Sequence, residues 1–409
     1  MTKAVQAHAL SEHWFKQCGG LEHFLANYWQ KKPLLIRQAI ADFTPPIDAN
    51  ELSGLSLEDD IESRLIIENT QQTPSQWDMQ CGPFTETDFQ TLPTDHWTLL
   101  VQAVDQWIPE VQDLLAYFDF LPQWRLDDIM VSYAADQGSV GPHYDQYDVF
   151  LLQAEGQRRW KIGQQCDENT PLLDGSALKI LKDFEQQNEW LLEPGDILYL
   201  PPALAHWGIA EGECMTYSIG FRSPTATEML SDLATELLAQ ENTDTHTVYR
   251  DPPLTPAMAN SAIGDDFIEE VRTLLLRKLD DKELLRNWFA RYMTTRKYPD
   301  MELLDGELLD RQLLDGELLD REPQDDDIPT PPWSGDTVLA HHPASRFAVL
   351  SGNTAKLAVD GDIYNCDHRF AVSLSNNKYL AINSLGKLAE RESDLINLLL
   401  NQGSLLIAE

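Results

Sequence analysis

The 409-residue chain is short of positive charge. It contains 30 Lys and Arg against 67 Asp and Glu, which gives a formal net charge of -37 at pH 7. Such a surface repels the phosphate backbone of nucleic acids, so we expect no direct nucleic-acid partner. It attracts Lys- and Arg-rich polypeptides, although the same charge also serves solubility or adaptation to salt.

Paired cysteines and long apolar runs are missing as well. No run approaches the roughly 18 apolar residues needed to span a bilayer, and residues 1–15 lack an apolar core of signal-peptide length. These absences predict a cytoplasmic protein with no membrane partner. The five cysteines form no CxxC pair, which is typical of free thiols in a reducing compartment: Cys18, Cys81, Cys166, Cys214 and Cys366.

The first part of the chain, residues 1–225, is predicted to combine helices and strands. A helix is expected over residues 10–30, before Pro33. Many short antiparallel strands at this spacing predict a double-stranded β-helix, the jelly-roll or cupin architecture, within an α+β fold. The expected strands cover 129–133, 149–152, 159–162, 197–200 and 215–221, with a hairpin turn at 154–157.

Apolar residues at helical intervals then predict a helical region over residues 226–302, large enough for a dimer interface. Residues 303–322 are four five-residue repeats, LLDGE, LLDRQ, LLDGE and LLDRE. Because five residues advance a helix by about 500°, the Leu pairs form no continuous stripe. We therefore expect residues 303–332 to be an acidic linker that carries no chemistry.

Residues 333–409 are predicted to form a small winged-helix-like domain with paired strands at 347–350 and 355–359. This segment holds six Lys and Arg against eight Asp and Glu. It therefore has no basic stripe for DNA, which favours a structural or protein-contact role.

Two short motifs indicate a metal site. One is Gly141-Pro142-His143-Tyr144-Asp145, and the other runs from Glu193 through Pro194-Gly195-Asp196 to His206. Side chains two apart on a strand share a face, so His143 and Asp145 are expected to point together, and His206 to join them from a neighbouring strand. Two histidines and one carboxylate hold a mononuclear Fe(II) and leave other positions open.

Zinc chemistry and a purely structural role fit these motifs less well. Zinc hydrolases also use two histidines and a carboxylate, but through a helical HExxH motif that is absent here. In the structural alternative, His143 caps a turn, Asp145 is solvated and His206 is a buried structural histidine. That alternative does not explain why both motifs occur within one barrel-like run.

An iron site of this kind commonly takes 2-oxoglutarate as cosubstrate. Its distal carboxylate needs a buried cation, best supplied by a planar guanidinium. Arg158 and Arg159 follow the HxD motif, and only one of two adjacent strand residues can point inward. The alternative is that both are surface charges.

These residues resemble the JmjC-type 2-oxoglutarate oxygenases, and more closely the bacterial ribosomal oxygenases, which hydroxylate an arginine of a large-subunit ribosomal protein. The resemblance rests on residues 28–34, 141–150, 158–160 and 193–221. It implies Fe(II), 2-oxoglutarate and O2 as cofactors, a basic ribosomal protein as substrate, and a homodimer built through the helical region. The LLDxx repeats do not belong to the family's pattern.

The resemblance also implies roles for individual residues. His143, Asp145 and His206 take the place of the iron ligands, and Arg158 that of the cosubstrate arginine. Three further positions complete the implied pockets: Ser132 and Thr216 for the cosubstrate, and Asp136 for a substrate guanidinium. Some relatives carry asparagine at the position of Thr216, and Asp136 is equally well an ordinary turn residue. Tyr147 and Trp207 are candidates for the wall of the substrate channel, with core packing as the alternative for Trp207.

Two other functions stay open at this point. One is the same chemistry on a histidine or methyl-lysine of a basic protein, although a carboxylate at Asp136 favours arginine. The other is a non-catalytic, cupin-like ribosome assembly factor. An inert scaffold has no need for His143, Asp145 and His206 together, which favours an enzyme.

Overall fold

The computed structural model describes residues 11–71, 75–239, 248–254, 263–301, 303, 333–350 and 355–408. Two compact units make up the chain, Met1–Ser223 and Pro224–Glu409. Apart from Leu303, the repeats and the predicted linker lie outside the described residues. The finer boundaries at 225, 302 and 332 stay predictions.

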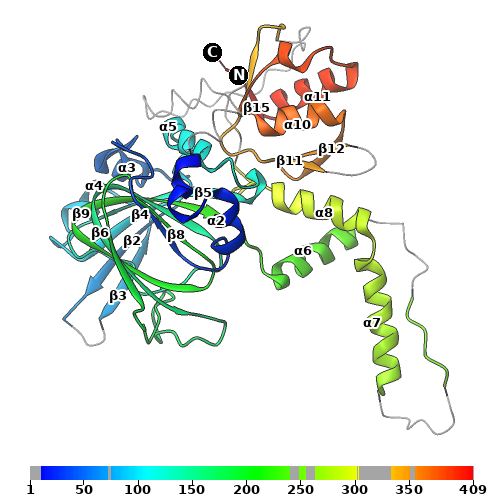
Figure 1. Cartoon of the computed structure of the whole chain (residues 1–409). Helices are drawn as coiled ribbons and strands as arrows, with labels where there is room; N and C mark the ends of the chain where they lie inside the picture. Colours follow the sequence, from blue (N-terminus) through cyan, green and yellow to red (C-terminus); the bar gives the residue numbers. More distant parts are fainter. Residues whose placement is uncertain are drawn as a thin grey trace. The chain divides into compact units, whose positions relative to one another are not determined.

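The first unit is built around a nine-stranded antiparallel sheet that is folded on itself (Figure 1). The strands follow one another in the order β1-β8-β6-β9-β5-β4-β2-β3, with β7 also paired to β6. Their bounds are β1 Leu34–Ile36, β2 Ser63–Asn69, β3 Gln76–Cys81, β4 Trp97–Val101, β5 Leu126–Ala134, β6 Val149–Gln165, β7 Asn188–Leu192, β8 Ile197–Leu200 and β9 Leu204–Phe221.

The longest pairing joins β6 and β9, from Val149↔Gly220 to Gln165↔Leu204. The sequence predicted two strands with a hairpin turn over 154–157, and this prediction is wrong. β6 continues through these residues, because Gly156 adopts φ +60° and the register shifts around it as a bulge. The predicted strands at 129–133, 197–200 and 215–221 lie within β5, β8 and β9.

Short helices cover one face of the sheet with an apolar core. The expected single helix over 10–30 is divided into η1 and α2, because Gly19 and Gly20 both take positive φ values. Phe15 and Phe24 from these two helices stack on each other and are fully buried. The helical segments are η1 Glu12–Cys18, α2 Leu21–Asn27, α3 Ala49–Leu55, α4 Glu86–Gln90, η2 Val104–Gln106, α5 Pro109–Gln112, η3 Asp113–Phe118 and η4 Gln123–Arg125.

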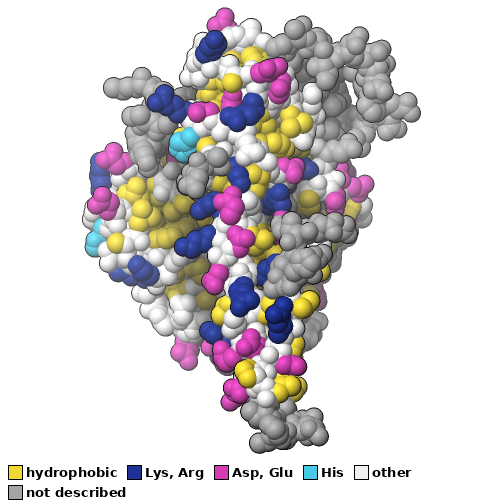
Figure 2. Space-filling model, turned by 90° about the vertical axis from the view of Figure 1, so that its right-hand side faces the viewer, with side chains coloured by type: hydrophobic (Ala, Val, Ile, Leu, Met, Phe, Trp, Pro, Cys, Tyr) yellow, Lys and Arg dark blue, Asp and Glu magenta, His cyan; other side chains and the backbone are white. Residues whose placement is uncertain are grey.

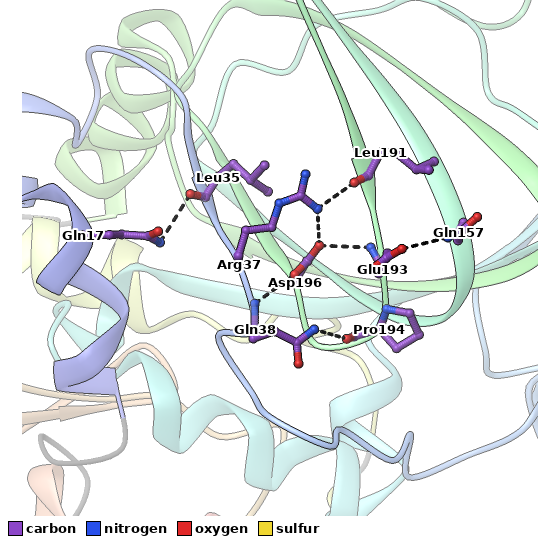
Figure 3. Close-up of polar contacts among 9 residues, drawn as sticks. All are labelled: Gln17, Leu35, Arg37, Gln38, Gln157, Leu191, Glu193, Pro194 and Asp196. Atoms are coloured by element: carbon purple, nitrogen blue, oxygen red, sulfur yellow. Dashed lines mark hydrogen bonds and ion pairs between the residues drawn. The ribbon is translucent and has the colours of Figure 1, made fainter.

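A buried carboxylate ties the turn before β8 to the segment after β1 (Figure 3). Asp196 is 1% exposed and accepts a hydrogen bond of 2.6 Å from the Arg37 guanidinium. It also accepts backbone N–H groups from Gln38 at 2.9 Å and Glu193 at 3.1 Å. The turn that leads into β8 is thereby held against β1, its neighbour in the sheet.

The second unit begins with helices α6 Ala226–Ala239, α7 Asp265–Leu279 and α8 Lys282–Thr294. Within the predicted helical region, α7 ends at Leu279 and α8 starts anew where the Asp281 side chain accepts the N–H groups of Glu283 and Leu284. No helix in the described parts of the chain is both long and apolar enough to cross a membrane.

The rest of this unit combines two three-stranded sheets with helices, and α8 packs against one of the sheets through Ala290, Leu350 and Ala358. The paired strands predicted near 347–350 and 355–359 are present as β11 and β12. The elements are β10 Val338–His341, β11 Phe347–Leu350, β12 Lys356–Val359, β13 Asp362–Asn365, α10 His368–Asn376, β14 Tyr379–Ala381, η5 Ile382–Leu385, α11 Glu390–Asn401 and β15 Leu405–Ala408.

The Asp196 contacts generate a stability prediction. We expect Asp196→Ala to lower the free energy of unfolding by about 2–4 kcal/mol, because two partly buried backbone N–H groups and the Arg37 guanidinium lose a charged acceptor. Arg37→Ala should cost about 1 kcal/mol or less, because the Arg37 side chain is 49% exposed and Asp196 keeps its backbone donors. Urea unfolding measures both, and equal losses in the two variants contradict this account.

Candidate metal and cosubstrate site

The HxD segment lies in the loop between β5 and β6 and pairs with the start of β9. The backbone N–H of His143 donates to His206 at 3.0 Å, and the N–H of His206 donates back to His143 at 2.8 Å. The N–H of Ala203 donates to the Asp145 carbonyl at 2.6 Å. Two parts of the chain more than 60 residues apart in sequence are thus brought side by side.

This pairing gathers three side chains that can hold a metal. Nε2 of His206 lies 3.5 Å from Oδ2 of Asp145, and Nε2 of His143 lies 4.0 Å from the same oxygen. One ligand atom from each of the three residues lies within 4.8 Å of the others. A group with this spacing can hold one metal ion.

Backbone carbonyl groups orient both imidazoles. Nδ1 of His143 lies 2.9 Å from the Gly141 carbonyl, and Nδ1 of His206 lies 2.9 Å from the Leu204 carbonyl. A carbonyl can only accept, so each Nδ1 carries the proton and each Nε2 keeps its lone pair. This is the tautomer that a metal needs, and Nε2 is the atom that faces Asp145.

Burial keeps His206 uncharged. Its side chain is 4% exposed, and this burial, followed by the neighbouring His143, lowers the pKa of His206 to about 4. The imidazole is therefore neutral at neutral pH, which is the form that binds metals. The side chains of His143 and Asp145 are 22% and 24% exposed, so the group is open on one side.

Arg158 and Arg159 point in opposite directions from β6. Arg158 is buried, and its Nε and Nη2 have no hydrogen-bond partner among the described residues. Arg159 instead donates to Glu189 and Glu211, each at 2.6 Å. Buried guanidinium N–H groups without partners are costly unless an anion binds to them, so Nε and Nη2 of Arg158 can hold an anion.

Cross-strand pairing puts Arg158 on the same face as the metal-binding group. We call this the inner face: it carries Arg158 and Trp160 of β6 opposite Ala210 and Gly208 of β9, next to His206. The Trp160 ring lies 5.9 Å from the His206 ring and 5.8 Å from the Arg158 guanidinium carbon. A Cβ on Gly208 would lie 2.7 Å from Trp160, so the Trp160 ring can take this position only because residue 208 is glycine.

Ser132 and Thr216 are buried cross-strand neighbours, and Gln153 lies beside them. The Ser132 hydroxyl lies 3.4 Å from the Thr216 carbonyl oxygen. The Thr216 hydroxyl donates to the Gln153 side-chain oxygen at 3.2 Å. Two of the predicted cosubstrate residues therefore form one polar row inside the barrel.

The candidates for substrate contact differ in their surroundings. Asp136 is exposed, and its carboxylate accepts the backbone N–H of Gly212 at 2.8 Å, which lowers the pKa of Asp136. This contact is that of a turn residue. Tyr147 is 41% exposed and its hydroxyl bonds to Asp145, whose charge raises the pKa of Tyr147 well above its usual value. Tyr147 therefore adjoins the metal-binding group.

Trp207, the other proposed channel residue, is held in place by a hydrogen bond and by packing contacts. Its indole N–H donates to Ser139 at 2.9 Å, its ring meets Phe184 edge-on, and Lys161 lies 4.8 Å from the ring. Sequence reasoning did not identify Trp160, Gln153 or Ser139 as parts of the site. For Trp160 a signal was available, because it lies two residues from Arg158 on the same strand and so shares its face.

Comparison with known proteins identifies the class to which this fold and site belong. A JmjC domain matches residues 113–229. A "Probable ribosomal oxygenase" of Haemophilus influenzae is 37% identical over 285 residues, which is 68% of this chain and 69% of that protein. The "Ribosomal protein uL16 3-hydroxylase" of Escherichia coli is 32% identical over 391 residues, or 93% of this chain and 95% of that protein.

Solved structures agree over nearly the whole chain. Escherichia coli YcfD superimposes with a TM-score of 0.76 at 30% identity, covering 95% of this chain and 98% of that chain. A structure of YcfD, described as a ribosomal oxygenase, in complex with cobalt and 2-oxoglutarate has a TM-score of 0.74 at 29% identity, with the same coverage.

The chain therefore belongs to the ribosomal oxygenase family of JmjC-domain proteins. This confirms the resemblance inferred from residues 141–150 and 193–221, and with it the cupin-type fold. Enzymes of this class work with Fe(II), 2-oxoglutarate and O2.

Proposed function

We propose that the chain is an Fe(II)- and 2-oxoglutarate-dependent hydroxylase that acts on an arginine side chain of a large-subunit ribosomal protein. The observation that carries the proposal is the buried guanidinium of Arg158, whose Nε and Nη2 have no partner among the described residues, on the same face as His206, which groups with His143 and Asp145. A metal group beside a buried anion site is what a chelating dicarboxylate cosubstrate requires. With such a substrate the enzyme would act in the cytoplasm, where ribosomal proteins are made.

The donor set fits the proposed metal. Two neutral imidazoles and one carboxylate suit Fe(II) and leave coordination positions for other ligands. His143 and His206 offer Nε2, and Asp145 offers a carboxylate oxygen. When bound, the iron with 2-oxoglutarate and O2 supplies the oxidising power to hydroxylate an unactivated carbon, with release of succinate and carbon dioxide.

The residues of the inner face prepare the site for the cosubstrate. Arg158 would hold the distal carboxylate through Nε and Nη2, which have no partner in the part of the chain that the structure describes, and a planar guanidinium can bind a carboxylate in bidentate fashion. Ser132 and Thr216 supply polar contacts in the same barrel interior. Trp160 and the apolar residues around it exclude water, which protects the protein from uncoupled oxidation.

Three observations support a basic polypeptide as substrate. The net charge of -37 attracts such a partner and speeds its arrival. The partly exposed Tyr147 adjoins Asp145, so it can contact a side chain that enters the site. The related Escherichia coli protein is named for hydroxylation of ribosomal protein uL16. Asp136 is proposed to meet the guanidinium, in addition to its turn contact with Gly212.

We also propose that the protein is a homodimer joined through α7. Ile268, Val271, Leu275 and Leu279 recur at helical spacing and are 38% to 61% exposed. Figure 2 shows hydrophobic side chains on this part of the surface, interspersed with charged ones.

The distribution of charge along α7 indicates which partner binds its exposed apolar stripe. The first turns carry Asp265, Asp266 and Glu269, and the last turn carries Arg277 and Lys278. A second copy related by a two-fold axis brings the acidic end of each α7 against the basic end of the other. A second copy of the chain is therefore the partner that this face fits.

Mass spectrometry tests the proposed activity. Incubation of purified large-subunit ribosomal proteins with the enzyme, Fe(II) and 2-oxoglutarate should add one oxygen to an arginine. The gain should vanish when iron or cosubstrate is omitted, and in the folded variants His143→Ala and Asp145→Ala. Iron-dependent succinate without modified arginine would move the substrate to another residue, such as histidine or methyl-lysine. The absence of both modified arginine and succinate would contradict the proposal and would favour a non-catalytic assembly factor.

Arg158→Met tests the cosubstrate role. Methionine fills similar space without charge, so we expect the concentration of 2-oxoglutarate for half-maximal turnover to rise on the order of 100-fold. Metal affinity should stay near that of the wild type. The matched control is Arg159→Met, which removes the outward guanidinium and should change the half-maximal concentration less than about twofold, since exposed ion pairs contribute little. An unchanged requirement in Arg158→Met excludes this role for Arg158.

Light scattering after size-exclusion chromatography tests the dimer. Leu275→Glu puts a charge into the apolar stripe of α7 and should convert the dimer to a monomer. Thr273→Glu adds the same charge to an exposed position on the other side of α7 and should leave the dimer intact. A monomeric wild type, or a dimer in both variants, would show that α7 does not form the interface.

A further inference from the structure

Ser139 lies in the loop between β5 and His143 and is 1% exposed. Its hydroxyl donates to the Gly208 carbonyl at 2.7 Å. It accepts the backbone N–H of Gly141 at 3.0 Å and the indole N–H of Trp207 at 2.9 Å. A serine hydroxyl has one donor and two acceptor positions, so its full hydrogen-bonding capacity is used.

The Ser139 hydroxyl lies where the backbone pairing between the loop before His143 and β9 becomes irregular. On one side, the N–H of Ala210 donates to Gly138 at 3.0 Å, and on the other His143 and His206 exchange two backbone bonds. Between these pairs the loop has one residue more than β9, so a regular ladder cannot continue. The Ser139 side chain supplies the partner that the Gly208 carbonyl would otherwise lack.

Two of the three hydrogen-bond partners of Ser139, Gly141 and Gly208, connect it to the two histidines. The Gly141 peptide donates its N–H to Ser139, and its carbonyl accepts Nδ1–H of His143 at 2.9 Å. Gly141 has φ +79°, and a Cβ there would lie 2.4 Å from Ile180, so this peptide cannot shift freely. On the other strand, Gly208 lies two residues from His206, with the Trp160 ring against it.

We propose that Ser139 is a positioning residue for the metal site: through Gly141 and Gly208 its hydroxyl sets the orientation of His143 relative to His206, and so the affinity for the metal. The inference rests on the proposed role of the two histidines as ligands. The bond from Trp207 anchors the hydroxyl from the side, and Phe184 and Lys161 hold that indole independently.

Cobalt(II) titration followed by visible absorbance tests the proposal without turnover, because the spectrum reports both occupancy and ligand geometry. Ser139→Ala removes a single oxygen and should weaken Co(II) binding on the order of 10–100-fold, the usual effect of removing a group that orients metal ligands. Its ligand-field spectrum should also differ from that of the wild type. Urea unfolding confirms that the variant is folded under the titration conditions.

Two control variants separate positioning from general stability. Ser63→Ala removes a buried hydroxyl from β2 that bonds to the Ser56 carbonyl, so it should leave Co(II) affinity unchanged. Trp207→Phe removes only the lateral anchor and should change the affinity less than about threefold.

The outcomes separate this inference from the proposed function. A wild type that does not bind Co(II) at His143, Asp145 and His206 contradicts the proposed function itself. A wild type that binds, with equal affinity and spectrum in Ser139→Ala, overturns the inference alone. If Trp207→Phe lowers the Co(II) affinity as much as Ser139→Ala does, the effect of Ser139 does not act through Gly141 and Gly208.

Discussion

β6 and β9 pair along their entire length, and the geometry of the candidate site depends on this pairing. The register sets Trp160 opposite Gly208 and Arg158 opposite Ala210, so the guanidinium and the His206 imidazole share one face. The start of β9 also pairs with the HxD loop through the two backbone hydrogen bonds between His143 and His206. A one-residue slip in either pairing would turn half of these side chains to the other face of the sheet.

Much of the site could be predicted because its chemistry is local. HxD presents two candidate metal ligands from positions two apart, and the strict alternation of a strand requires one of Arg158 and Arg159 to face inward. The continuous β6 was not predicted, because Gly156 has the same sequence signature in a bulge as in a hairpin turn. The break of the first helix depends on positive φ at Gly19 and Gly20. Ser139 could not be found at all, since its partners Gly208 and Trp207 are about 70 residues away in the sequence.

Contacts within the chain organise the candidate site. Carbonyl groups fix both imidazole tautomers, burial keeps His206 neutral, and Arg158 already lies in the barrel with unpartnered N–H groups. Burying the Arg158 nitrogens without partners costs stability in the folded chain, and the Asp196 contacts and the aromatic core beneath the short helices offset that cost.

The central claim is that one ion and one dicarboxylate occupy this inner face together. A crystal structure of the protein with Mn(II) and 2-oxoglutarate, prepared without oxygen, tests it most directly. The account predicts the ion on Nε2 of His143, Nε2 of His206 and the Asp145 carboxylate, with the distal carboxylate of 2-oxoglutarate on the Arg158 guanidinium. An ion bound elsewhere, or a cosubstrate carboxylate that does not contact Arg158, would contradict it.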